Sequence, residues 1–204
     1  MKASLIAFAA VFALTMLLTQ GTNAQTRQAR AAKQIDSYAR SIERIIDGRK
    51  RPDLVFADTA SYDDGKVKWH KFVSIKELEK YREKTETYSI AYSWKRNGRI
   101  VATNFTLFSP SGDWAKYVMH YFRGDGSLAK VTSELRTFYG DFVMTRTEYF
   151  DPAGRRLKTG TEYRDLKTKK PKKPTKDMLA ENPMANSDDH YKRVRDLPFA
   201  KLVK

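Results

Sequence analysis

The chain has 204 residues, with 39 lysines and arginines against 24 aspartates and glutamates, so its formal charge is +15. It contains no cysteine, which excludes disulfides, thiolate zinc sites and cysteine nucleophiles. Its three histidines leave little material for a histidine-based metal site. A chain of this length can bury enough surface to form one domain with its own core.

Residues 1–24 have the three parts of an export signal. Lys2 supplies a positive charge, residues 5–18 form an apolar run of 14, and Thr22-Asn23-Ala24 is a small-x-Ala cleavage sequence. The run is shorter than the ~20 apolar residues that a membrane span needs. We therefore predict a signal peptide over 1–24 and export to the periplasm or the outside of the cell, with no transmembrane span after cleavage. An uncleaved N-terminal anchor is the alternative.

Apolar residues recur at helical spacing after this signal. Ile35, Ala39, Ile42 and Ile46 stand in a stretch whose other positions are mostly charged or polar. Asp47-Gly48 is typical of a helix end, so the pattern predicts an amphipathic helix over 27–47. Further along, we expect short strands at 54–57 and 66–73, and a helix to about residue 82 that is capped by Ser74.

Five glycines follow one another at a constant spacing of 14 residues: Gly98, Gly112, Gly126, Gly140 and Gly154. A fixed period indicates one supersecondary unit that is repeated. Most of these glycines end short turn sequences, and the segments between them are rich in threonine, valine, tyrosine and phenylalanine. We therefore predict strands of an antiparallel meander at 86–95, 99–109, 113–123, 127–137, 141–151 and 155–165.

The alternation of side chains along these strands predicts one apolar face. If each three-residue loop preserves residue parity, even positions of the first strand and odd positions of the later strands share a face without any charged residue. The opposite face then lies in solvent, with Lys116 opposite Glu134 and with Glu148 between Lys130 and Lys158.

The fold class that follows is α+β. We predict a single domain over 25–166 in which the N-terminal amphipathic helix packs on a curved antiparallel β-meander of six to seven strands. A small closed β-barrel is the alternative, because the 14-residue period is compatible with both. The order of a helix and then a meander resembles periplasmic lipoprotein-carrier folds in arrangement only, and this likeness assigns no site residue.

The composition changes after residue 166. Residues 167–176 hold six lysines and two prolines and no apolar side chain, so we predict a disordered, lysine-rich tail over 167–204. Its lysines are candidate contacts for anionic envelope polymers or lipid heads. No specific nucleic-acid binding is expected, because no aromatic residue alternates with the basic ones. The six candidates are Lys167, Lys169, Lys170, Lys172, Lys173 and Lys176.

No hydrolase triad motif, phosphate loop, dinucleotide fingerprint or His-x-x-x-His sequence occurs, so we predict no catalytic residue, metal site or cofactor. Tyrosines on the predicted apolar face are candidate ligand-binding residues, because buried hydroxyls need partners. They are Tyr92, Tyr117, Tyr121, Tyr149 and Tyr163. The alternative is that these hydroxyls bond one another or water at the helix margin.

From these features we predict an exported, non-enzymatic protein with an interaction or structural role in the cell envelope. The alternative function is a periplasmic carrier or binder of a lipophilic molecule. In that case the ligand would lie under the helix, against the tyrosine-lined face of the sheet.

Overall fold

The computed structural model describes residues 3–60, 65–186 and 190–203, and the side chains of 26–60, 65–182, 184–185 and 190–203. Helix α1 spans Ala3–Arg49 and helix α2 spans Ile75–Arg82. The strands are β1 Leu54–Asp58, β2 Trp69–Phe72, β3 Ser89–Arg96, β4 Arg99–Phe108, β5 Trp114–Phe122, β6 Leu128–Thr137, β7 Phe142–Phe150 and β8 Arg156–Asp165.

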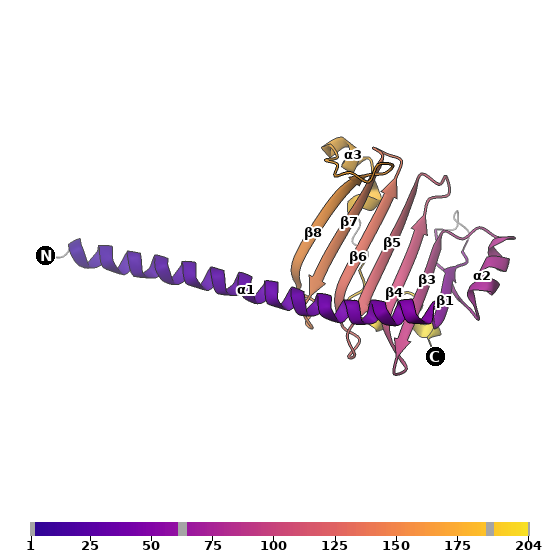
Figure 1. The fold of residues 1–204 in the computed structure, drawn as a ribbon, viewed down its shortest axis with the longest axis horizontal. Helices are drawn as coiled ribbons and strands as arrows, with labels where there is room; N and C mark the ends of the chain where they lie inside the picture. The colour runs from indigo at the N-terminus through magenta and orange to yellow at the C-terminus, as the bar shows by residue number, and fades with distance from the viewer. Residues whose placement is uncertain (1–2, 61–64, 187–189, 204) are drawn as a thin grey trace.

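All eight strands form one antiparallel sheet in the order β2-β1-β3-β4-β5-β6-β7-β8, so β3 to β8 follow one another as hairpins (Figure 1). The α+β class and the antiparallel meander are confirmed. The sheet has eight strands rather than six to seven, because β1 pairs with both β2 and β3. It is an open sheet that ends at β2 and β8, so the alternative of a closed barrel is wrong.

Helix α1 crosses the sheet near one end of the strands, and its N-terminal part continues past β8 (Figure 1). The helical spacing of its apolar residues is explained by packing, since Ala39 and Ile42 are fully buried against Trp94 and Tyr121. The helix is longer than the predicted 27–47. Among the described residues, no helix combines the length and apolar content needed to cross a membrane. The signal peptide and the export of the chain stay predictions.

The observed hairpins change whether odd- or even-numbered residues of the later strands lie on a given face of the sheet. Loops 110–113 and 138–141 hold four residues, as the pairs Phe108–Ala115 and Thr137–Phe142 show. The other three hairpins contain register shifts, for example between Tyr121 and Phe122. One additional residue in a hairpin moves every later side chain to the other face. The predicted charge-free face is therefore wrong, because its positions are divided between the two faces strand by strand.

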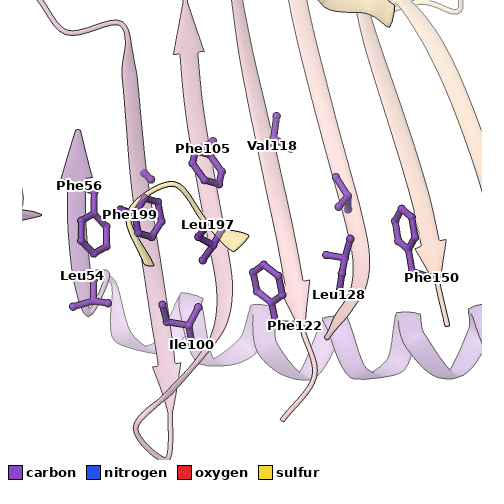
Figure 2. Packing of buried hydrophobic residues seen from close by; sticks show 12 residues of the cluster. Leu54, Phe56, Ile100, Phe105, Val118, Phe122, Leu128, Phe150, Leu197 and Phe199 are labelled. Atoms are coloured by element: carbon purple, nitrogen blue, oxygen red, sulfur yellow. The ribbon is translucent and has the colours of Figure 1, made fainter. Parts of the chain in front are cut away.

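A second layer covers the face opposite α1. It consists of residues 182–186 and 190–203, which we call the C-terminal strap and which include α4 (Pro183–Asn186), η2 (Val194–Asp196) and η3 (Ala200–Leu202). Leu197 and Phe199 are buried in the largest core cluster, and the Phe199 ring stacks on Phe56 with centroids 4.0 Å apart (Figure 2).

The structure thus differs from the predicted disordered tail over 167–204. The segment also contains the short helix α3 (Lys176–Ala180), whose first turn is capped by the Thr175 hydroxyl. The apolar residues near the C-terminus are few, but Leu197 and Phe199 bury their side chains in a cluster formed by residues of β1 and β3 to β7. Such burial offsets the entropy of ordering the strap.

Candidate functional site

The five tyrosines predicted to bind a ligand do not share one face. Tyr92, Tyr117, Tyr121 and Tyr149 lie on the side of α1, as their cross-strand pairs and their contacts with the helix show. Tyr163 is paired with Met144 and packs with Phe142 on the opposite side. Tyr163 lies on the other face because the observed hairpins change which residues of each strand face α1.

Two of these tyrosines join α1 to the sheet. The Tyr121 hydroxyl donates to Glu43 Oε1 at 2.7 Å, and the Tyr149 hydroxyl donates to Asp36 at 3.0 Å. Lys130 Nζ lies 2.8 Å from the same Asp36 carboxylate. Burial, together with the bond to Asp36, raises the pKa of Tyr149 to about 12. Burial and Glu43 raise the pKa of Tyr121 as well, so both side chains remain neutral donors.

The region under α1 is filled by these contacts and by close packing. Ala32, Ala39 and Ile42 are buried directly on sheet residues such as Ala129 and Ala102. A cavity of about 380 Å³ beside the helix is lined by Tyr149, Lys158 and Gly160 of the sheet and by no residue of α1. Four tyrosines therefore lie on the α1 side of the sheet, and the hydroxyls of two of them are bonded to carboxylates of the helix.

The side of α1 that faces away from the sheet is basic. Arg30, Lys33, Arg40 and Arg44 recur at spacings of three, seven and four residues, which places them on one stripe of a helix. All four are exposed to solvent. We call these four residues the outer stripe of α1. The sequence carries this signal, because the basic residues recur at helical spacing between the apolar residues that predict the buried side.

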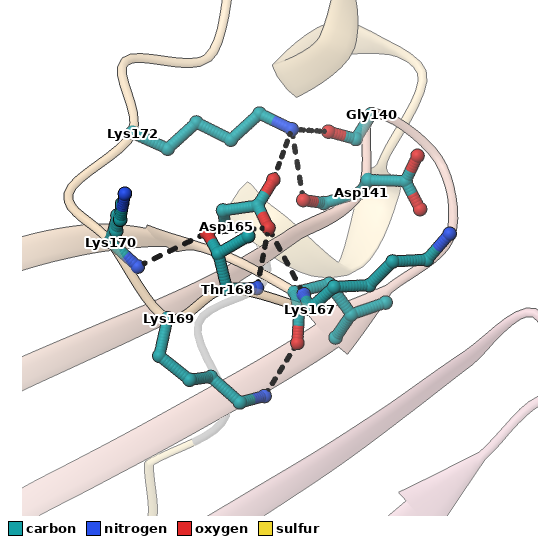
Figure 3. A network of polar contacts seen from close by, with 9 residues as sticks. Gly140, Asp141, Asp165, Lys167, Thr168, Lys169, Lys170 and Lys172 are labelled. Carbon is teal, nitrogen blue, oxygen red and sulfur yellow. Dashed lines mark hydrogen bonds and ion pairs between the residues drawn. The ribbon is translucent and has the colours of Figure 1, made fainter.

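The predicted lysine site is partly used within the chain. Lys172 Nζ donates to the carbonyl oxygens of Gly140 at 2.6 Å and Asp141 at 2.9 Å, and it lies 3.5 Å from Asp165 (Figure 3). Lys169 Nζ donates to the carbonyl of Leu166 at 2.6 Å. The other four predicted lysines are exposed: Lys167, Lys170, Lys173 and Lys176. The six lysines therefore do not form one uniform binding segment.

Lys116 was expected in solvent, but both Lys116 and His120 are buried under the C-terminal strap, with exposed fractions of 1% and 0%. Lys116 Nζ donates to the Met184 carbonyl at 3.0 Å, and the Tyr191 backbone N–H donates to His120 Nε2 at 3.4 Å. Burial lowers the pKa of His120 to about 3, so the ring is a neutral acceptor. Both side chains therefore hold the strap on the sheet.

The predicted cross-strand ion pairs are also different. Lys116 is opposite Leu135, and Glu134 instead pairs with Arg136 at 2.6 Å. Glu148 is buried and pairs with Arg156 at 2.8 Å. The reversed parity of the hairpins accounts for these changes, because it separates the predicted partners onto opposite faces.

Two neighbouring cavities open on the face that the strap covers, with volumes of about 420 and 400 Å³. The first is lined by apolar side chains that include Trp69, Phe105 and Tyr191. The second continues to Trp114 and Met184. Both share a common wall of Asp58, Val67, Ser89 and Leu107. Volumes of this size are typical of sites for small ligands.

Comparison with protein-family models, curated proteins and solved structures gives no match for this chain. Among the described residues, no three histidine, aspartate or glutamate side chains are grouped so that they could hold a metal ion. The functional argument therefore depends on the surfaces and cavities described above.

Proposed function

We propose that this protein is an exported, non-enzymatic component of the cell envelope that attaches to an anionic surface through the outer stripe of α1. The observation that carries the proposal is the separation of charges on this helix. Asp36 and Glu43 turn toward the sheet, where they accept hydrogen bonds from Tyr149 and Tyr121. The basic residues of the stripe point the opposite way, into solvent.

This separation makes the outer stripe more cationic than the composition of the helix suggests. Lys130 and the two tyrosine hydroxyls engage the acidic groups on the sheet side, and hydrogen bonds from Lys130 and Tyr149 outweigh burial to hold the pKa of Asp36 below its ordinary value. A stripe of arginine and lysine at helical spacing favours phosphate or carboxylate groups on a surface. Each such contact is worth about 1 kcal/mol near an anionic membrane.

Co-sedimentation with vesicles that contain an anionic phospholipid tests the proposal, with an acidic polysaccharide as a second probe. The full chain should bind at low ionic strength and lose affinity steeply as salt is added. The triple variant Arg30→Glu, Arg40→Glu and Arg44→Glu should bind on the order of 100-fold more weakly. Binding to vesicles but not to the polysaccharide would identify lipid heads as the target, and the reverse would identify a polymer.

The matched control carries the same change in net charge on the predicted lysine site. Lys167→Glu, Lys170→Glu and Lys173→Glu alter three exposed lysines outside α1. This control should lose much less affinity than the α1 variant. Equal losses would show that net charge alone governs attachment, and a larger loss in the control would return the site to the C-terminal lysines; either result overturns the role of the outer stripe.

A second candidate function is carriage of a lipophilic molecule, and the cavities under the strap favour it. Most of the lining of each cavity is apolar, including Trp69 and Phe105 in the first and Phe108 and Trp114 in the second. Asp58 is engaged at the wall that the two cavities share, because its Oδ1 accepts the backbone N–H groups of Ala60 and Lys68. The ligand that fits is therefore an elongated apolar molecule, bound chiefly by burial of its surface.

Native mass spectrometry of the intact protein would detect such a ligand if it copurifies. Val67→Asp would introduce a charge at the wall shared by both cavities, at a position that is 69% exposed and so can accept it without loss of the fold. The variant should lose the added mass and the uptake of a fluorescent fatty-acid probe. Absence of both ligand and uptake in the unaltered protein would contradict this second function.

A further inference from the structure

The outer edge of β8 is open along five residues. In the described part of the chain β8 ends the sheet, and residues 158–162 are all exposed. At one end of this segment, Asp165 N donates to Lys170 O at 2.8 Å and Lys172 N donates to Tyr163 O at 3.0 Å, so residues 170–172 cover the edge there. At the other end, a register shift opposite Tyr149 and Phe150 interrupts the strand.

The open segment has backbone N–H and C=O groups that point outward, where another strand could pair with them. The outward bonds of Tyr163 and Asp165 show that odd-numbered residues point their N–H and C=O groups away from β7. By the alternation of a strand, Thr159 and Thr161 present theirs outward as well. An open row of donors and acceptors is a template for another strand.

We propose that β8 pairs in antiparallel fashion with β8 of a second copy of this chain, around a two-fold axis at Gly160. Gly160 is the middle residue of the open segment 158–162. A two-fold axis there lets the open segments of the two copies pair over their full length, while the covered ends of β8 stay outside the contact. In this register Thr159 faces Thr161 of the second copy, and their outward backbone groups form the hydrogen bonds. Lys158 faces Glu162 of the second copy, and the symmetry makes this pair twice.

The charges select this register. An axis at Thr159 would place Lys158 opposite Gly160, and an axis at Thr161 would place Glu162 opposite Gly160. Within the open segment 158–162, only the axis at Gly160 joins opposite charges directly, and such cross-strand pairs stabilise a sheet. Within one copy, Glu162 lies 3.5 Å from Arg164 on the surface, where screening by solvent makes the pair weak.

Gly160 fits the centre of such an interface. No heavy atom lies within 4 Å of the position where its Cβ would be, so the glycine is not required by neighbours in its own chain. A glycine inside a strand often marks the close approach of another backbone.

A single cysteine tests this geometry, because the chain has none of its own. In the proposed register the two Gly160 residues form a non-hydrogen-bonded pair, with Cα atoms about 4.5 Å apart. This distance is within the range that a disulfide bridges. The full chain with Gly160→Cys should form a covalent dimer under mild oxidation. The control Val73→Cys, 92% exposed beyond the opposite edge strand, should remain monomeric.

Sedimentation of the cysteine-free protein gives an independent measurement. Lys158→Glu and Glu162→Lys should each weaken dimerisation by roughly 2- to 30-fold, because each creates two like-charge pairs. Combining the two substitutions reverses both charges and should restore the dimer. A monomer at every concentration, cross-linking of Gly160→Cys no faster than that of Val73→Cys, or a double variant no better than the single ones would overturn the proposal.

Discussion

The two faces of the sheet are covered in different ways. On one face, α1 packs small and aliphatic residues on the strands and makes hydrogen bonds at its margin through Tyr121 and Tyr149. On the other face, the C-terminal strap inserts Leu197 and Phe199 into the largest core cluster. The helix therefore keeps an exposed, basic outer side, whereas the strap completes the core. Substitutions on the two faces should differ accordingly.

The largest expected effect is in the strap. Phe199→Ala removes a ring that is fully buried and stacked on Phe56, and it should lower the free energy of unfolding by about 3–5 kcal/mol. Denaturant melts of the full chain measure this difference. A chain that ends at Asp165 should be less stable still, although the sequence placed the whole core before that residue. A loss below about 1 kcal/mol for Phe199→Ala would show that the strap is not part of the core.

Much of the sheet could be predicted because its signals are local. Turn residues at a 14-residue period placed six strands, and each observed strand starts or ends within a few residues of its prediction, as Leu128–Thr137 shows for 127–137. The parity of the faces could not be predicted in the same way. Whether the loop that follows Ser109 holds three or four residues depends on the geometry of the turn, which the composition does not reveal.

The strap could not be predicted because its burial is a long-range effect. Phe199 packs on Phe56 and Phe105, which precede it by more than 90 residues, and the segment itself is mostly polar. The candidate sites show the same limit. The tyrosine residue type correctly indicated hydroxyls that need partners, but the partners Asp36 and Glu43 are on a helix far away in sequence.

A pair of neighbouring residues on β5 tests the corrected faces. Lys116→Ala should cost about 2–4 kcal/mol, because it removes a fully buried side chain and its bond to the Met184 carbonyl. Tyr117→Ala should cost about 1–2 kcal/mol, because this ring is only partly buried on the α1 side. The parity inferred from the sequence predicts the reverse order. Denaturant melts of the two variants decide between the two arrangements.

The buried His120 should make stability depend on pH. Burial lowers its pKa from 6.5 to about 3 in the folded chain, so only the unfolded chain takes up the proton between these values. Protonation of His120 in the unfolded chain therefore does not affect the free energy of unfolding above pH 6.5. As pH falls from 6.5 toward 3, it lowers the free energy of unfolding by up to about 1.4 kcal/mol per pH unit. Melts at several pH values should show this slope between pH 6 and 4.5.

The control for this slope is His120→Gln, which keeps an acceptor near the Tyr191 backbone N–H but does not titrate. This variant should be less stable at pH 7 and should lose less stability than the unaltered chain between pH 6 and 4.5. Carboxylates with lowered pKa values, such as Asp36, contribute mainly at lower pH. Parallel curves for the two proteins would show that His120 takes up its proton in the folded state as readily as in the unfolded one.

The smallest expected effect separates two adjacent lysines after β8. Lys172→Ala removes hydrogen bonds to the carbonyls of Gly140 and Asp141, and it should cost about 1 kcal/mol. Lys173→Ala alters an exposed side chain and should change stability by less than about 0.5 kcal/mol. Both variants lose one positive charge, so thermal melts at high salt remove the common contribution of net charge. If the difference persists at high salt, it comes from the local bonds of the Lys172 side chain; if it vanishes, the two lysines act on stability only through their charge.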